Sequence, residues 1–219
     1  MVLDQQRNNI DPILLKISKI LININPNKIS WFSFVFAFIA GIFFYFSNPT
    51  KELFNFYLYL AAIFVFLNGL FDAIDGKVAK ITNKSSIKGD FLDHALDRYG
   101  DVIILSGLAL SSWNRYPTLG ILAISGMLLT SYMGTQSQAI GYKRNYSGFL
   151  GRADRLILLM VAAVIQHVFL YYNEIGIIFN FYIIEWVLIY FSVFGNITAI
   201  QRFYYTLKWL NKNNYNKIK

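Results

Sequence analysis

The sequence contains no cysteine, only two histidines and few charged residues. Without cysteine the chain can form no disulfide bond, thiolate nucleophile or zinc–thiolate site. Charged residues make up 15% of its 219 positions, whereas soluble globular proteins carry about a quarter. Because 56% of the residues are hydrophobic and 18% are aromatic, the composition favours an integral membrane protein.

The charge that is present is unbalanced, with 20 lysines and arginines against 12 aspartates and glutamates. A basic chain can bind nucleic acid, but in a hydrophobic chain we favour basic loops that face anionic lipid headgroups. We therefore expect membrane lipids, and no nucleic acid, among its partners.

Six apolar runs are long enough to cross a bilayer, which takes about 20 residues. They cover residues 30–47, 54–81, 89–112, 117–141, 152–172 and 180–209. Before them, apolar residues between Ile10 and Ile24 recur at helical spacing, which predicts an amphipathic helix in the membrane interface. We predict an all-α membrane protein with one domain, residues 1–219. It comprises an interfacial helix and turn (1–29), a core of six transmembrane helices (30–209) and a tail (210–219).

The basic residues predict the orientation of the chain in the membrane. If the N-terminus lies in the cytoplasm, every lysine and arginine except Lys51 and Arg115 falls on or near the cytoplasmic side. The excess of positive charge on cytoplasmic segments then predicts a multi-pass protein of the cell membrane with both termini in the cytoplasm. The connection between the second and third spans faces the cytoplasm in this arrangement.

An acidic stretch interrupts the apolar pattern at that connection. Asp72 and Asp75 are three residues apart at the end of the second predicted span, and Asp93 and Asp97 are four apart at the start of the third. These spacings place each pair on one helix face, so two adjacent helices can direct four carboxylates to one spot. Asp101 continues the second pair one turn further.

Four converging carboxylates repel one another unless a cation lies among them. Oxygen ligands without histidine or cysteine suit Mg²⁺, Mn²⁺ or Ca²⁺, and paired divalent ions commonly bind the phosphates of a phosphoryl-transfer reaction. Gly76, Ala79 and Gly89 are small residues beside the aspartates, where helices or a flat ligand can approach closely. The alternative is a set of solvated helix ends that form salt bridges with nearby lysines and Arg98.

The pattern of these residues resembles the signature of the CDP-alcohol phosphotransferases, D-x-x-D-G-x-x-A-R and then G-x-x-x-D-x-x-x-D. Lys80 stands where that family usually has arginine, which keeps the charge but loses the planar fork. Members have an interfacial helix and six spans. They transfer a phosphatidyl-type group from a CDP-linked lipid to an alcohol and release CMP.

The resemblance implies roles for individual residues. Two divalent ions, Mg²⁺ or Mn²⁺, are expected to bind Asp72, Asp75, Asp93 and Asp97. Asp97 is also the expected general base on the acceptor hydroxyl. The residues expected to bind the CDP-lipid are Asp72, Asp75, Gly76, Ala79, Lys80, Gly89 and Asp93. Members of the family are often homodimers, so a homodimer is expected.

A second basic cluster bears on the acceptor. Arg152 and Arg155 begin the fifth predicted span, and their guanidinium groups suit a phosphate. Simple anchoring of positive charge at the cytoplasmic side is the alternative. Residues 131–141 and 148–156 resemble the members that make phosphatidylinositol phosphate, especially archaeal ones that join CDP-archaeol to inositol phosphate. The resemblance implies a phosphorylated acceptor held by Gln136, Lys143, Arg152 and Arg155.

Other functions remain open at this point. Glycerol phosphate, or inositol phosphate joined to CDP-inositol, could replace the expected substrates, and CDP-diacylglycerol could replace CDP-archaeol. A cation transporter with an aspartate-lined site is the rival class. A transporter should carry polar residues through the membrane midplane and paired broken helices, whereas the charges here cluster toward one side.

Overall fold

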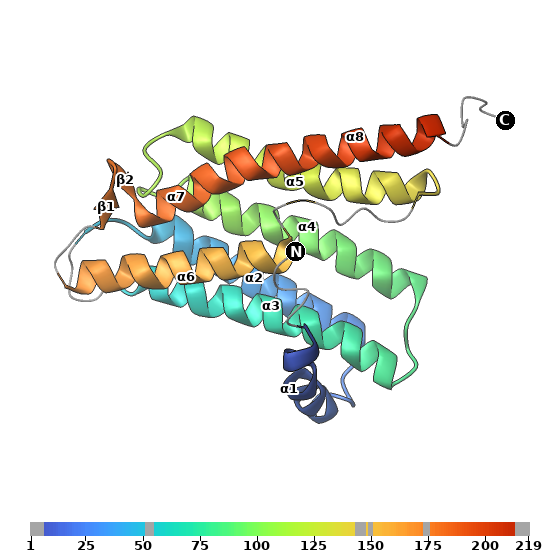
Figure 1. Cartoon of the computed structure of the whole chain (residues 1–219). Coiled ribbons are helices and arrows are strands. Elements are labelled where there is room, and N and C mark those ends of the chain that lie inside the picture. Colours follow the sequence, from blue (N-terminus) through green and yellow to red (C-terminus); the bar gives the residue numbers. More distant parts are fainter. Residues whose placement is uncertain (1–6, 51–54, 143–147, 149–150, 173–175, 213–219) are drawn as a thin grey trace.

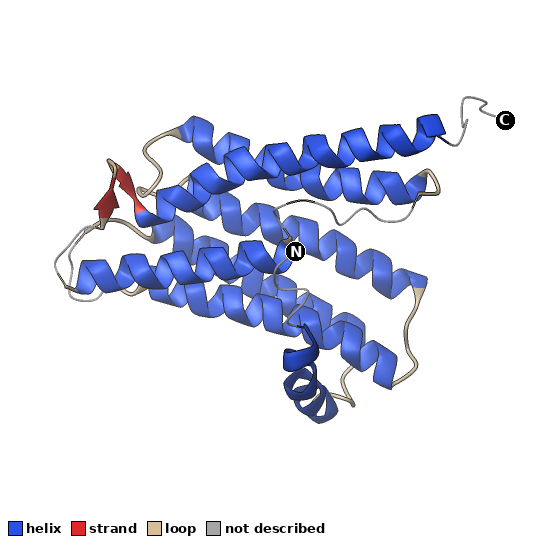
Figure 2. Cartoon of the chain, in the orientation of Figure 1, coloured by secondary structure: helices blue, strands red, loops and turns tan. Residues whose placement is uncertain are grey.

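The computed structural model describes residues 7–50, 55–142, 148, 151–172 and 176–212, and these form a bundle of long helices with one short hairpin (Figures 1 and 2). The helices are α1 (Arg7–Ile20), α2 (Pro26–Phe46), α3 (Tyr57–Ile81), α4 (Ile87–Ala109), α5 (Pro117–Ala139), α6 (Arg152–Tyr171), α7 (Ile183–Tyr190), the π-helical turn η2 (Phe191–Gly195) and α8 (Asn196–Lys212). The strands are β1 (Ile177–Ile178) and β2 (Phe181–Tyr182). The predicted all-α membrane fold is confirmed.

Five of the described helices are long and apolar enough to cross a membrane, rather than the predicted six. They are α2, α3, α5, α6 and the continuous run from α7 through η2 to α8, Ile183–Lys212. The sixth predicted span corresponds to this run, and the third corresponds to α4. With 23 residues α4 has the required length, but aspartates and Arg98 make its first half too polar for a simple apolar span.

Local capping explains where α2 and α4 begin. The side chain of Asn25 accepts a hydrogen bond from the backbone N–H of Asn27, and Pro26 occupies the first helical position, which its fixed φ favours. The helix therefore begins four residues before the predicted span. Ser86 caps α4 in the same way, since its Oγ accepts from the backbone N–H of Gly89 at 3.1 Å. This cap places Gly89 in the first turn of α4.

Close packing of α2 against α4 depends on a pair of glycines. A Cβ on Gly107 would lie 2.1 Å from the carbonyl oxygen of Gly41, so no larger residue fits between these backbones. The main hydrophobic core fills the space between α2, α3, α4, α5, α6 and α7. Helix α3 packs against α2 and α6, so α2, α3, α4 and α6 can contribute to one site.

The interfacial helix α1 lies across the flank of the bundle against α3 (Figure 1). Its apolar residues pack on a small second core formed by Ile29, Ile74 and Val78. An ion pair of 2.9 Å between Asp11 and Lys77 joins α1 to α3. The predicted amphipathic helix is present, and its apolar face packs on α2 and α3.

The last predicted span begins three residues late and contains a feature that the sequence did not indicate. Strands β1 and β2 pair before it, with Ile177 opposite Tyr182. The run contains the π-helical turn η2, and the carbonyl of Gly195 at the end of this turn accepts a hydrogen bond of 2.8 Å from the hydroxyl of Thr130 on α5.

Candidate metal and substrate site

The four motif aspartates line one pocket between α2, α3 and α4. Asp72 and Asp75 lie in the last turns of α3, and Asp93 and Asp97 lie in the first turns of α4. The other lining residues are Ser30, Ser33, Phe34, Asn68 and Leu96. The structure thus brings together the carboxylates that the helical spacing directs to a common spot.

Helix α2 supplies the residue that fixes Asp75. Asp75 is 5% exposed, and its Oδ2 accepts a hydrogen bond of 2.6 Å from the hydroxyl of Ser30. Nothing in the sequence pattern indicated Ser30, because the contact depends on how α2 packs against α3. One carboxylate oxygen of the pocket is therefore held by a neutral donor in a set direction.

Asn68 adds a further oxygen atom to the pocket. Its Nδ2 donates to the backbone oxygen of Ser33 at 3.1 Å and to the Ser33 hydroxyl at 2.9 Å, which joins α3 to α2. Its Oδ1 is buried and has no hydrogen-bond partner among the described residues. An orphaned amide oxygen beside four carboxylates fits a hard divalent cation such as Mg²⁺ or Mn²⁺.

His94 lies close to this pocket but fits a metal less well. Ligand atoms of Asp93, His94 and Asp97 lie within 4.8 Å of one another. The ring nitrogens of His94 also lie 3.6 Å from Asp93 and 3.7 Å from Asp90, and His94 does not line the pocket of the four aspartates. The carboxylates are therefore the better candidates for metal ligands, since hard cations prefer oxygen.

Arg152, the first residue of α6, contacts two aspartates of the acidic pocket. Its Nη1 forms an ion pair with Oδ2 of Asp72, and its Nη2 lies 2.8 Å from Oδ1 of Asp97. Because two nitrogens of one guanidinium contact both carboxylates, Asp72 and Asp97 face each other across a single side chain. The sequence analysis predicts that Arg152 binds the acceptor, and in the structure this side chain contacts Asp72 and Asp97.

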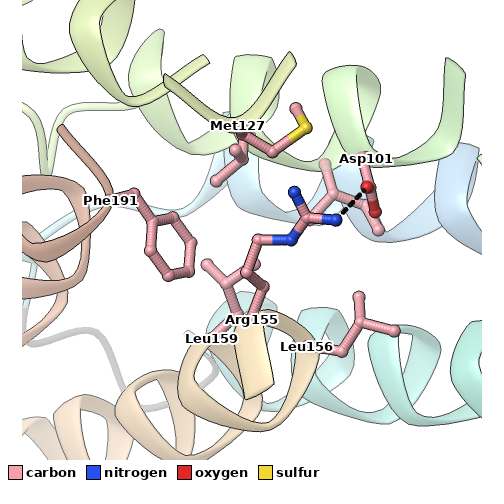
Figure 3. Close-up of a pocket in the computed structure, with 8 residues that line it drawn as sticks. Asp101, Met127, Arg155, Leu156, Leu159 and Phe191 are labelled. Atoms are coloured by element: carbon pink, nitrogen blue, oxygen red, sulfur yellow. Dashed lines mark hydrogen bonds and ion pairs between the residues drawn. The ribbon is translucent and has the colours of Figure 1, made fainter. Parts of the chain in front are cut away.

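Arg155 lies one turn further along α6 and pairs with Asp101 instead. Its Nη2 donates to Oδ2 of Asp101 at 2.8 Å, and the arginine side chain is 5% exposed. Figure 3 shows this contact in an adjoining pocket whose other walls are apolar, including Met127 and Phe191. Its Nε and Nη1 have no hydrogen-bond partner among the described residues.

The remaining predicted site residues lie at several places around the pocket. Gly76 is exposed, and a Cβ there would meet no described atom within 4 Å. Ala79 and Gly89 are partly buried, while Lys80 is exposed at the end of α3. Gln136 is exposed on α5. Lys143 lies outside the described residues.

Comparisons with known proteins identify the family. A model of the CDP-alcohol phosphatidyltransferase family matches residues 23–198. An archaetidylinositol phosphate synthase of Pyrococcus horikoshii is 29% identical over 211 residues, which cover 95% of this chain and 98% of the relative.

Solved structures share the fold. The crystal structure of Mycobacterium tuberculosis phosphatidylinositol phosphate synthase with CDP-DAG bound has a TM-score of 0.69 at 20% identity, over 89% of this chain and 94% of that chain. The same enzyme in complex with manganese and citrate also has a TM-score of 0.69 at 20% identity, over 89% of this chain and 88% of that chain. Since the family match runs from before α2 into α8 and includes all four aspartates, the chain belongs to the CDP-alcohol phosphatidyltransferase family.

Proposed function

We propose that this CDP-alcohol phosphatidyltransferase uses inositol phosphate as its acceptor, with CDP-archaeol or CDP-diacylglycerol as its donor. The observation that carries the proposal is the single pocket in which Asp72, Asp75, Asp93 and Asp97 meet. The similarity to an archaetidylinositol phosphate synthase over almost the whole of both chains supports the choice of acceptor.

Two divalent cations, Mg²⁺ or Mn²⁺, are the proposed cofactors, and the four aspartates would hold them. When bound, the ions neutralise the diphosphate of the donor and the charge on the departing CMP. Asn68 Oδ1 offers one more oxygen, and Ser30 keeps Asp75 directed into the pocket.

Asp97 is the proposed general base. It lies in the pocket with the other three aspartates, and its side chain is 12% exposed, so it is largely shielded from solvent yet reachable from the pocket. Its carboxylate would take the proton of the acceptor hydroxyl as that oxygen attacks the phosphorus.

The donor is proposed to bind along the exposed end of α3. The open face at Gly76 leaves room for the nucleotide, and Lys80 can place an ammonium group near its phosphates. The apolar outer surface of the helices, which includes Phe38 and Phe66, suits the lipid tails. A site at the end of apolar helices thus accepts a donor with one polar and one apolar part.

The acceptor phosphate is proposed to bind the basic cluster. Arg152 already contacts two aspartates of the pocket, whereas Arg155 is buried against Asp101. Arg152 is therefore the first candidate to meet an anionic acceptor. Gln136 and Lys143 complete the proposed set.

We also propose that the site and both termini face the cytoplasm and that the protein is a homodimer. The distribution of lysine and arginine supports the orientation. The dimer is supported by the family resemblance.

CMP release from a CDP-lipid in the presence of Mg²⁺ or Mn²⁺ tests this function. We expect inositol phosphate to support CMP release from the CDP-lipid more strongly than inositol or glycerol phosphate does. We also expect the CDP-lipid with inositol phosphate to release more CMP than CDP-inositol with inositol phosphate. A preference for another acceptor would contradict the proposed substrate and leave the family reaction intact. Ion flux in liposomes without CMP release would favour a transporter.

A further inference from the structure

Arg152 joins the two helices that carry the motif. Its guanidinium contacts Asp72 on α3 and Asp97 on α4, and its side chain is only 16% exposed. The side chain starts from α6, so a fourth helix supplies a cation to a pocket made by α2, α3 and α4. No feature of the motif itself requires this cation.

The contacts of Arg152 use oxygens that a divalent cation also needs. Each carboxylate oxygen that accepts a charge-assisted hydrogen bond gives one lone pair to the guanidinium, and the positive charge of the guanidinium repels a metal ion at the same carboxylate. Asp75, in contrast, is held by the neutral hydroxyl of Ser30. Arg152 therefore opposes a metal ion at two of the four aspartates.

Asp101 offers Arg152 an alternative partner beside the pocket. This carboxylate lies one turn beyond Asp97 on α4 and is 6% exposed. Its Oδ1 is 3.5 Å from Nε of Arg152, which has no hydrogen-bond partner among the described residues. Movement of the guanidinium toward Asp101 would shorten this contact and lengthen the contacts with Asp72 and Asp97.

We propose that Arg152 is an internal competitor for the divalent-cation site. It holds Asp72 and Asp97 until a metal ion displaces it, and Asp101 then keeps it at the edge of the pocket. The inference rests on the proposed function, because it needs a metal ion at these aspartates. Its consequence is an order of events: the metal ion binds first and frees a guanidinium for an anionic substrate.

Mn²⁺ binding to the purified full chain without substrate, measured by calorimetry, tests the competition. Arg152→Gln removes the competing cation, and we expect the Kd for Mn²⁺ to fall about tenfold, within the usual range for coupled sites. Arg98→Gln is the matched control. Arg98 lies 3.5 Å from Asp97 and 3.7 Å from Asp101, so this substitution also removes a positive charge near the site. It should lower the Kd much less.

The outcomes separate the inference from the proposed function. An unchanged or raised Kd in Arg152→Gln, or an equal fall in both variants, would overturn the competition and leave the metal site in place. If neither the wild-type chain nor Arg152→Gln binds Mn²⁺, the proposed metal site fails, and the inference fails with it.

A second measurement does not depend on the folding of Arg152→Gln. In the ¹⁵N-arginine-labelled wild-type chain, the Nε–H signal of Arg152 can be assigned by its loss in Arg152→Lys. We expect this signal to move when Mg²⁺ is added, because the guanidinium changes partners. A signal that stays in place while Mg²⁺ binds would contradict displacement.

Discussion

At the scale of single residues, Asp97 is the side chain on which the proposed chemistry depends most directly. Its carboxylate lies 2.8 Å from Arg152 and 3.5 Å from Arg98, and it lines the pocket with Asp72, Asp75 and Asp93. Asp97→Asn keeps the size of the side chain and one oxygen but cannot take a proton. We expect kcat for CMP release to fall by about two to four orders of magnitude, the usual contribution of a general base.

Measurements of stability and of donor binding are the controls for Asp97→Asn. The thermal unfolding midpoint and CDP-lipid binding should change little, because the amide can still accept a hydrogen bond from Arg152. A variant with near-normal turnover would remove the assignment of Asp97 as the base.

Gly76 separates a role in packing from a role in binding. A Cβ there would meet no described atom within 4 Å, so Gly76→Ala should fit the fold. Since glycine inside a helix is less stable than alanine by about 0.5–1 kcal/mol, we expect the free energy of unfolding to rise slightly. We expect KM for the CDP-lipid to rise as well, because the methyl group occupies the open face of the proposed nucleotide site.

Gly107→Ala is the matched control for Gly76→Ala. Its Cβ would lie 2.1 Å from the carbonyl oxygen of Gly41, and overpacking of this kind costs about 1–3 kcal/mol. It should therefore lower the thermal midpoint. If Gly76→Ala were stable and bound the CDP-lipid normally, the open face would not belong to the donor site.

At the scale of elements, the first turn of α7 connects two loops at the end of the bundle away from the aspartates. The side chain of Glu185 is fully buried, and its Oε1 accepts hydrogen bonds from the backbone N–H of Arg115 at 3.0 Å and from its Nε at 3.2 Å. Its Oε2 accepts from Arg115 Nη2 at 2.6 Å and from the backbone N–H of Tyr182 at 2.9 Å. The loop after α4 and the hairpin strand β2 are thereby joined to α7.

We expect Glu185→Ala to destabilise the fold without altering the site. Breaking a buried ion pair costs about 3–5 kcal/mol, and the lower end applies here because the Arg115 side chain is 33% exposed. Denaturant unfolding in detergent measures the loss. Asp90→Ala, which removes a carboxylate that is 75% exposed, should cost less than about 0.5 kcal/mol. A changed Kd for Mn²⁺ in Glu185→Ala would show that this end of the bundle is coupled to the site.

The long elements could be predicted from the sequence, but several of their boundaries and the shortest elements could not. Apolar runs of about 20 residues give a strong signal, and α3, α5 and α6 coincide closely with their predicted spans. Helix α2 begins earlier than the predicted span, because the N-cap at Asn25 determines where the helix starts. Strands of two residues and a π-helical turn are too short to give a periodic signal. Their positions depend on long-range contacts such as the hydrogen bond from Thr130 to Gly195.

The candidate site shows the same division. Helical spacing alone predicts that Asp72 and Asp75, and likewise Asp93 and Asp97, share a face. The contacts from Ser30 and Arg152 could not be predicted in this way, since they come from α2 and α6 and depend on how these helices pack. The sequence shows that residue 152 is a positively charged arginine, but it does not show that the side chain contacts Asp72 and Asp97.

At the scale of the whole molecule, the two ends of the bundle differ in their connections. The turn between α3 and α4 lies at the end to which the C-terminal part of α8 also points, and the loop after α4 lies at the opposite end with the hairpin (Figure 1). The turn carries Lys84, with Lys80 just before it and Lys88 just after it, whereas the opposite loop carries Arg115, which Glu185 neutralises. This difference in positive charge is consistent with the proposed cytoplasmic location of the end with the α3–α4 turn.

The lack of cysteine makes this orientation directly testable. Ser85 in the α3–α4 turn and Ser112 in the loop after α4 are both exposed, and each can be replaced by cysteine with little change of shape. In intact cells a membrane-impermeant maleimide should label Ser112→Cys and leave Ser85→Cys unlabelled until the membrane is permeabilised. The parent chain provides the background, because it has no thiol. The opposite labelling pattern would place the aspartates on the outer side, where the proposed site could not draw a CDP-lipid from the cytoplasmic leaflet.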